Sequence, residues 1–240
     1  MSIVYIKNNK GGVGKSWLTF QLAHGLSLIE ITEGRKAKVL IVTTDSQNNI
    51  LDFALSKEIE LGEGLESWVA KGNGDLIRLR DNLEYIPLNS SNFTASFKNK
   101  IKSTLYTLKE KYDYIFIDAV PVAGLDKEFE DIADIIIIPG FMDIVTLQGI
   151  NKILETVNIN KVKAIVPNRF NNSAYEKKLL NNFREVIDGT KILLTSPIPQ
   201  TALITNLISK NKTVWETSNK RIEPIQEVLG EVLEVILNEE

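Results

Sequence analysis

The chain of 240 residues contains no cysteine and only one histidine, His24. The first absence excludes disulfides, thiolate metal sites, iron–sulfur clusters and a cysteine nucleophile. The second argues against a histidine-based catalytic triad and a multi-histidine metal site. Long hydrophobic runs are also missing, because no apolar stretch approaches the roughly 20 residues that cross a bilayer. The start, MSIVYIKNN, lacks the basic lead-in and the apolar length of a signal peptide, so we expect a cytoplasmic protein.

Basic and acidic residues are segregated in the last third of the chain. Residues 161–221 carry eleven lysine and arginine residues against four acidic residues, a net charge of +7. Residues 222–240 carry six glutamates and no basic residue. A basic block of this kind suggests an anionic partner, although a solvated lysine-rich surface has the same composition.

Short apolar runs alternate with longer stretches of helical spacing along the whole chain. Strands are predicted at 3–8, 38–44, 83–89, 112–118, 134–139, 162–168 and 191–197, and helices near 15–30, 93–111, 143–157, 173–187 and 222–237. Several strands are apolar throughout, which suits strands that helices cover on both faces. The pattern predicts one α/β domain, residues 1–240, with a doubly wound, mainly parallel sheet and ligands at the carboxyl ends of its strands. Residues 46–82 are less regular and predict short helices.

The stretch IVYIKNNKGGVGKSWLTFQLAHGL reads as a strand, a glycine-rich loop and a helix. A phosphate-binding loop has glycine, four residues, then Gly-Lys-Ser/Thr. Asn9 stands at the first glycine position, where its tolerance of positive φ would preserve the turn. Backbone N–H groups and the helix dipole would hold phosphates, and an incidental glycine-rich turn is disfavoured by the flanking strand and helix. The predicted nucleotide-binding residues of the loop are Gly11, Gly12, Val13, Gly14, Lys15, Ser16 and Trp17.

Lys15 and Ser16 have the more specific roles in this pattern. Lys15 is expected to reach the β- and γ-phosphates, and the Ser16 hydroxyl to bind Mg²⁺. The motif KGGVGKS resembles the deviant Walker A motif of the ParA/MinD family of P-loop ATPases. The resemblance implies Mg²⁺-ATP binding, ATP hydrolysis and a nucleotide-sandwich dimer, in which the signature lysine, here Lys10, reaches phosphates bound by the partner subunit. Trp17 departs from the family, which usually has a hydroxyl residue there that contacts the α-phosphate.

Two further motifs of the family follow in the same order. VLIVTTDSQNN (39–49) resembles its second motif, in which Asp45 matches the aspartate that positions or activates the attacking water. The other aspartate of that motif is Thr43 here, a departure that bears on the organisation of Mg²⁺. YDYIFID (112–118) resembles the family's Walker B strand, which implies that Asp118 belongs to the Mg²⁺ shell. The alternatives are a helix-capping role for Asp45 and a turn role for Asp118.

The resemblance also covers the region that recognises the base. VKAIVPNRF (162–170) resembles the strand end where the family reads adenine with an asparagine, here Asn168, beside which Arg169 could stack. SPIPQTALITNLISKNKTVWE (196–216) resembles a family stretch in which Pro199 and its neighbours would supply backbone contacts to the base. Ordinary loop residues are the alternative for both segments.

The branches of the family that rely on cysteine are disfavoured in this chain. A lipid-binding C-terminal helix is also disfavoured, because Ile225, Val228, Leu229, Val232 and Ile236 form an apolar side opposite glutamates, which anionic lipid would repel. We expect that helix to pack on the sheet.

The remaining resemblance is to small ParA-type partition ATPases without an N-terminal helix-turn-helix domain. It implies an ATP-dependent homodimer that binds DNA nonspecifically, partitions plasmid, chromosome or other cargo, and works with a ParB-type adaptor. The residues proposed to contact DNA are Lys177, Lys178, Arg184, Lys210, Lys212, Lys220 and Arg221. One alternative is a MinD-like positioning switch that acts on protein or membrane partners. Another is a ligase of the dethiobiotin-synthetase type, against which Lys10 argues.

Overall fold

A computed structural model of the chain describes residues 1–120 and 124–238. Its main sheet has eight strands in the order β10-β9-β8-β1-β7-β4-β6-β5, and β2 pairs with β3 separately. The strands are β1 Ser2–Ile6, β2 Glu30–Thr32, β3 Arg35–Lys36, β4 Val39–Thr43, β5 Ile77–Arg80, β6 Leu83–Ile86, β7 Tyr114–Asp118, β8 Ile135–Gly140, β9 Val162–Pro167 and β10 Leu193–Leu194. The α-helices are α1 Lys15–Leu28, α2 Asn49–Ala54, α3 Leu65–Lys71, α4 Ala95–Lys109, α5 Asp126–Ile132, α6 Ile144–Thr156, α7 Ala174–Ile187, α8 Ala202–Ile208 and α9 Glu223–Leu237. The 3₁₀ turns are η1 Ile159–Lys161, η2 Val214–Glu216 and η3 Lys220–Ile222.

The sheet is parallel except at one edge, where β5 pairs antiparallel with β6. In the centre of the sheet, Asp118 is in register with Ile6 of β1 on one side and with Thr43 of β4 on the other. The carboxyl ends of β1, β7 and β4 therefore lie level with one another. Each of these ends leads into one of the three predicted phosphate and magnesium motifs.

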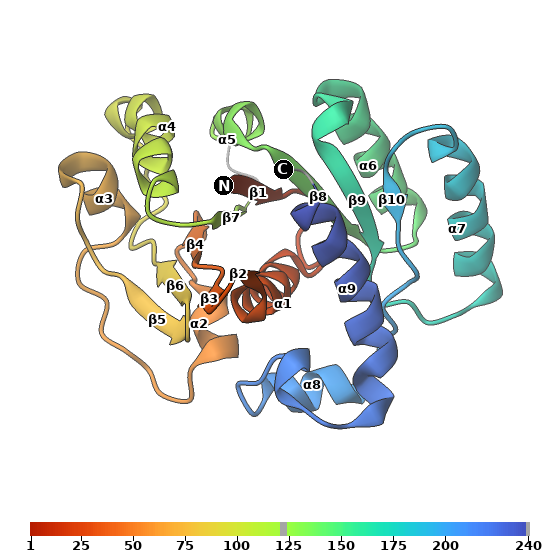
Figure 1. Ribbon diagram of the computed structural model, residues 1–240. Coiled ribbons are helices and arrows are strands. Elements are labelled where there is room, and N and C mark those ends of the chain that lie inside the picture. The colour runs from red at the N-terminus through yellow and green to blue at the C-terminus, as the bar shows by residue number, and fades with distance from the viewer. Residues whose placement is uncertain (121–123, 239–240) are drawn as a thin grey trace.

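Helices cover both faces of the sheet, because its central strands are apolar throughout (Figure 1). Successive residues of β1 enter opposite cores: Ile3 packs with α3 to α7, while Val4 packs with α1, α2 and α9. Leu40 and Ile41 of β4 divide in the same way. The doubly wound, mainly parallel α/β fold that the sequence predicts is confirmed.

All the predicted strands and helices are present, and two strands end three residues before their predicted limits. β6 ends at Ile86 because Pro87 has no N–H to donate, and β10 contains only Leu193–Leu194 before a segment with two prolines. The elements that the sequence pattern does not predict are β5, the β2–β3 hairpin, α5 and α8. These elements are short, which leaves little room for a periodic pattern.

The packing predicted for the last helix is confirmed. Residues Ile225, Val228, Leu229, Val232 and Ile236 are all buried in the core that α9 shares with α1 and the sheet. Figure 1 shows α9 beside α1 on that face. None of the helices in residues 1–120 and 124–238 is long and apolar enough to cross a membrane.

Helix α1 is buried over almost its whole length, so its polar side chains need partners within the protein. Thr19 Oγ1 donates to the carbonyl of Lys15, and Gln21 Oε1 accepts from the backbone N–H of Val214. His24 Nδ1 lies 2.7 Å from Thr213 Oγ1. Burial lowers the pKa of His24 to about 4, although Glu216 acts in the opposite direction. The ring is therefore neutral at pH 7.

This buried histidine should make stability depend on pH. In the unfolded chain His24 binds a proton near its ordinary pKa of 6.5, whereas in the folded protein it does so near 4. Between these values the unfolded state binds more protons than the folded state. The free energy of unfolding is therefore highest above pH 6.5 and decreases as the pH drops toward 4, by up to about 3 kcal/mol. Denaturant unfolding at pH 7, 6 and 5 should show a flatter pH profile for His24→Gln than for the wild type. Equal profiles would refute this.

Candidate functional site

The glycine-rich loop connects β1 to α1 and uses left-handed backbone at two glycines. Gly12 has a φ of 74° and Gly14 a φ of 96°. A Cβ at Gly14 would also collide with the side-chain amide of Asn168. The prediction that Asn9 would need positive φ is wrong, because the described residues with positive φ do not include it. The loop turns at Gly12 and Gly14 instead, which removes the need for a glycine at position 9.

Lys15 begins α1 and is almost completely buried. Its Nζ donates to the carbonyl of Lys10 at 3.1 Å, so the ammonium group is held against the loop. Burial lowers the pKa of Lys15, while the carboxylates of Asp118, Asp126 and Asp45 act to raise it. A cation in this position is poorly solvated and well placed to bind an anion.

Asp118, at the end of β7, is the buried carboxylate of the site. Burial raises its pKa to about 6, whereas the Ser16 hydroxyl, which hydrogen-bonds to it, and the Lys15 ammonium act to lower it. Asp45 contributes a further increase through its negative charge. The carboxylate, the hydroxyl and the ammonium group thus meet at the carboxyl edge of the sheet.

Asp45 lies just beyond β4 and is held in one orientation. Its Oδ1 accepts from the backbone N–H of Gln47 at 2.9 Å, and its Oδ2 accepts from Asn49 Nδ2 at 3.0 Å. Thr43, which replaces the family's aspartate, accepts from the Asp45 N–H and donates to the Asp118 carbonyl. Its hydroxyl therefore links the two acidic segments through their backbones. Asn48, not Asp45, occupies the N-cap position of α2.

A cavity of about 440 Å³ opens in front of these groups. Its lining includes most of the predicted nucleotide, metal and catalytic residues: Gly11, Gly12, Gly14, Lys15, Ser16, Trp17, Asp45, Asp118, Asn168, Arg169 and Pro199. Val13 does not line it, because its side chain is buried in the interior. Lys10 also lies outside the lining. The lining residues that the sequence analysis missed include Phe53, at the end of α2, and Thr201, Ile204, Thr205 and Ile208, on or beside α8.

Helix α8, the part of the cavity wall that was not predicted, can be recognised from its sequence. Thr201 Oγ1 accepts from the Leu203 N–H as an N-cap, and apolar residues follow at 203, 204, 207 and 208. That spacing is helical. The segment has only seven helical residues, which explains why it reads as a loop in the sequence.

Asn168 and Arg169 are held by the protein around them. Asn168 Nδ2 donates to the carbonyl of Val13 at 2.9 Å, so this amide fastens β9 to the phosphate loop. The Asn168 Oδ1 accepts from the N–H of Arg169, which has a φ of 50°. The Arg169 guanidinium lies over the ring of Phe141, at 5.9 Å. Pro199 is exposed beside them and pairs with Phe170 in an isolated bridge.

Lys10 is bound within its own chain. Its Nζ forms an ion pair with Asp143 Oδ2 at 2.9 Å and donates to Thr146 Oγ1 at 2.8 Å. The ammonium also lies 5.3 Å from the ring of Phe141. Burial acts to raise the pKa of Asp143, but hydrogen bonds from Lys10 and Thr146 outweigh it and lower the pKa. About a third of the Lys10 side chain is exposed, at 35%.

The seven basic residues proposed for DNA contact are all exposed, but they belong to two groups. Lys177, Lys178 and Arg184 lie on α7, which packs on the same face of the sheet as α4 to α6. Lys210, Lys212, Lys220 and Arg221 lie after α8 and in η3, next to the core that contains α1 and α9. Figure 1 shows α7 and α8 in separate parts of the fold.

Trp17 is buried in the core and is also one of the residues that line the cavity. Binding of Mg²⁺-ATP should therefore change the emission of Trp17. A fluorescence titration of the wild type should saturate, and Trp17→Phe should lose most of the change. Trp68→Phe is the matched control, because Trp68 lies on α3 over the opposite core and bonds to the Asp75 carbonyl. An undiminished signal in Trp17→Phe would contradict the placement.

Comparisons with known proteins agree with this geometry. An uncharacterized protein of Methanocaldococcus jannaschii, MJECL24, is 26% identical over 244 residues, which cover 90% of this chain and 91% of that protein. The sporulation initiation inhibitor protein Soj of Bacillus subtilis is 28% identical over 171 residues, 65% of each chain.

Solved structures share the fold over nearly the whole chain. An ATP complex of McdA from Cyanothece has a TM-score of 0.79 at 18% identity and covers 98% of this chain and 96% of that one. A plasmid partition protein of Borrelia burgdorferi bound to AMPPNP has a TM-score of 0.71 at 23% identity, covering 99% and 97%. A family model described as an AAA domain, AAA_31, matches residues 1–171. The chain therefore belongs to the AAA_31 family and has the P-loop fold that it shares with ParA and MinD proteins.

Proposed function

We propose that this protein hydrolyses Mg²⁺-ATP, dimerises around two ATP molecules, binds duplex DNA without sequence preference and drives the partition of plasmid, chromosome or other cargo. The observation that carries the proposal is the meeting of Lys15, Ser16, Asp45 and Asp118 at one cavity. Similar proteins have been solved with ATP, with AMPPNP and, for MinD of Pyrococcus horikoshii, with Mg-ADP. These support a nucleotide in the cavity.

The residues present fit a magnesium ion that arrives with a nucleotide. Mg²⁺ commonly takes one or two protein oxygens and completes its shell with phosphates and water. Asp118 and Ser16 provide those oxygens, and Asp118 has a pKa of about 6, so it is mainly ionised at pH 7. No cluster of three or more His, Cys, Asp or Glu that could hold a metal by itself occurs in residues 1–120 and 124–238. When bound, the ion would neutralise charge on the β- and γ-phosphates.

The other roles follow from position. Lys15 binds the phosphates, with the backbone N–H groups of the loop around them. Asp45, whose oxygens are fixed by Gln47 and Asn49, orients the attacking water. Lys10 must leave Asp143 to reach a partner's phosphates, so dimerisation exchanges a carboxylate for a phosphate at this ammonium group. Asn168, Arg169 and Pro199 line the same cavity and would contact the base.

The proposed role in partition is tested by measuring the binding of nonspecific duplex DNA. Mg²⁺-ATP should raise the affinity for nonspecific duplex DNA over that seen with ADP, with a steep decrease as salt increases. Because the basic residues form two groups, they are tested separately: Lys177→Glu with Lys178→Glu, and Lys210→Glu with Lys212→Glu. Loss of binding in one pair, uniform across sequences and with a salt slope lower by about one per lost phosphate contact, identifies the surface.

A control variant is Lys111→Glu, which changes an exposed lysine that follows α4. It should bind DNA as the wild type does. Tight binding of one defined sequence by this chain alone, or equal binding with ADP and ATP, would contradict the proposal. A ParB-type adaptor is the partner we expect to stimulate hydrolysis.

The second candidate is an ATP-gated positioning switch of the MinD type. A MinD protein of Emiliania huxleyi is 26% identical over 82% of this chain, and the complex of MinC with MinD from Aquifex aeolicus has a TM-score of 0.75. The buried apolar face of α9 disfavours docking of that helix on lipid. ATP-dependent binding to anionic vesicles in place of DNA would favour this candidate.

A further inference from the structure

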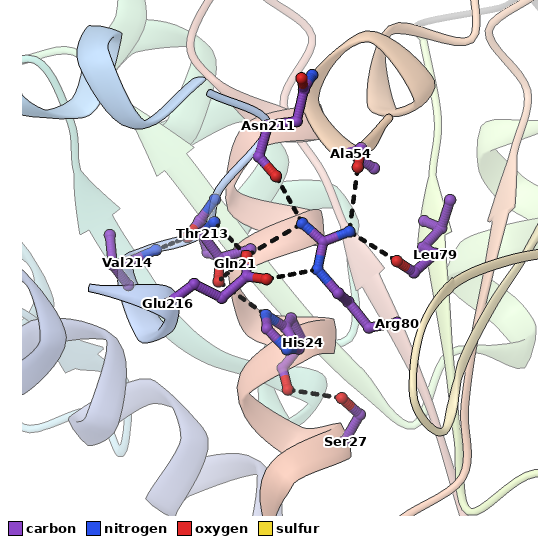
Figure 2. A network of polar contacts seen from close by, with 10 residues as sticks. All are labelled: Gln21, His24, Ser27, Ala54, Leu79, Arg80, Asn211, Thr213, Val214 and Glu216. Carbon is purple, nitrogen blue, oxygen red and sulfur yellow. Dashed lines mark hydrogen bonds and ion pairs between the residues drawn. The ribbon is translucent and has the colours of Figure 1, made fainter. Parts of the chain in front are cut away.

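The guanidinium of Arg80, at the end of the edge strand β5, uses all five of its N–H donors (Figure 2). Its Nε and Nη2 donate to the two carboxylate oxygens of Glu216, at 2.8 and 3.0 Å. Nη2 also donates to the Asn211 carbonyl at 2.6 Å. Nη1 donates to the carbonyls of Ala54 and Leu79, at 3.1 and 2.6 Å. One side chain thus binds two segments that are far apart in the sequence.

Both of these segments continue from walls of the nucleotide cavity. Ala54 ends α2, whose residues Asn49 and Phe53 line the cavity. Asn211 follows α8, whose residue Ile208 also lines it. A second link runs beside the first, because Asn211 Nδ2 donates to the carbonyl of Asp52, on α2, at 2.9 Å.

The same network reaches α1, the helix that starts at the phosphate loop. Glu216 Oε2 accepts from the Thr213 N–H at 2.8 Å, and Thr213 Oγ1 lies 2.7 Å from His24 Nδ1 (Figure 2). The N–H of Val214 donates to Gln21 Oε1 at 2.8 Å. Segment 209–216 is therefore tied to α1 and α2 while it continues from α8, so it is linked to three elements around the cavity.

We propose that Arg80 is a positioning residue that couples occupancy of the nucleotide cavity to segment 209–216, which carries the exposed residues Lys210 and Lys212. The proposal rests on the proposed function, in that ATP is the occupant of the cavity. A nucleotide that draws α2 and α8 toward itself displaces the Ala54 and Asn211 carbonyls, which Arg80 joins. A ligand shifts the equilibrium between two conformations of such a segment only by the difference in its affinity for the two. The fork of Arg80 joins the two walls through four of their oxygen atoms, beside the single Asn211–Asp52 hydrogen bond, and we assign the coupling to it.

The fork geometry provides the critical variant, Arg80→Lys. A lysine keeps the positive charge but presents three donors at a single point, so it cannot reach acceptors on both walls at once. Arg78 is the matched control. It lies two residues earlier on β5, its side chain is 72% exposed, and it pairs with Asp81 on the surface. Arg78→Lys makes the same chemical change outside the network.

The experiment is amide hydrogen exchange of the full chain with and without Mg²⁺ and a non-hydrolysable ATP analogue. In the wild type and in Arg78→Lys, the analogue should slow exchange in residues 11–18 and also in 209–216, in the latter by at least about fivefold. In Arg80→Lys, residues 11–18 should still be protected, whereas the nucleotide-dependent change in 209–216 should be lost. A purely structural role would raise basal exchange but leave that nucleotide-dependent difference unchanged.

The outcomes separate this proposal from the proposed function. Absence of protection at 11–18 in the wild type overturns nucleotide binding and the coupling together. Protection at 11–18 without any at 209–216 in the wild type overturns the coupling alone, as does a wild-type response in Arg80→Lys. If Arg80→Lys does not fold, Arg80→Gln replaces it, because the shorter glutamine has a single NH2 group and cannot donate to the carbonyls of Ala54 and Asn211 together. A wild-type response in Arg80→Gln would then overturn the proposal.

Discussion

Replacing Lys15 by alanine is expected to lower the affinity for Mg²⁺-ATP by at least about a hundredfold. Hydrogen bonds to charged groups contribute about 1.5–3 kcal/mol each, and on the proposed function this ammonium group makes two of them to phosphates. The group is buried, so solvent does not replace what the substitution removes. Isothermal titration calorimetry of the variant and the wild type measures the difference directly.

The same substitution should also act through Asp118. Lys15 lowers the pKa of this buried carboxyl group, which burial holds at about 6. Without Lys15 the pKa rises further, so less of Asp118 is ionised at pH 7 and able to bind the magnesium ion that we propose for this site. Affinity in Lys15→Ala should therefore recover partly when the pH is raised from 7 to 8.5, while the wild type changes less.

Lys111→Ala provides the control for loss of a lysine, because Lys111 is exposed and follows α4. It should bind Mg²⁺-ATP as tightly as the wild type. Undiminished affinity in Lys15→Ala would show that the glycine-rich loop does not bind phosphate through this residue.

The centre of the fold could be predicted because burial and sequence pattern agree there. Strands such as β1 and β8 are apolar throughout, since helices cover both of their faces, and parallel order then places their ends together. The ends of β1 and β7 carry motifs that sequence spacing identifies. The edges of the sheet carry a weaker sequence signal. Strand β5 reads IRLR, and its last residue, Arg80, bonds to Glu216 and does not pack in a core.

The parts of the site that sequence reasoning missed depend on contacts between distant residues. Phe53 joins the cavity only because α2 folds over the phosphate loop, and α8 only because the chain returns past β9. At Asn9 the motif was misleading. It suggested a positive φ at this residue, whereas the loop has positive φ at Gly12 and Gly14. No local pattern could have paired Lys10 with Asp143, 133 residues away.

Replacing Lys10 by alanine is expected to leave ATP binding at Lys15 largely intact and to raise the dissociation constant of the ATP-bound dimer by at least about a hundredfold. Two nucleotides brought face to face repel each other, and one lysine from each subunit would offset that repulsion in a partly desolvated interface. Each such charge pair is worth about 2 kcal/mol or more when one partner is removed, and a symmetric dimer loses two. Light scattering after size exclusion, with Mg²⁺-ATP and an Asp45→Ala background to suppress turnover, measures the dimer.

The ion pair between Lys10 and Asp143 supplies the control for a role within one subunit. If Lys10 acted only by fastening Asp143 at the start of α6, Asp143→Asn would weaken dimerisation as much as Lys10→Ala does. Asn keeps the N-cap hydrogen bond to Thr146 but removes the charge that holds the lysine, so the ammonium group is released. A lysine that works across the dimer should therefore leave Asp143→Asn at least as dimeric as the parent. An ATP-dependent dimer that persists in Lys10→Ala would show that this lysine serves its own subunit.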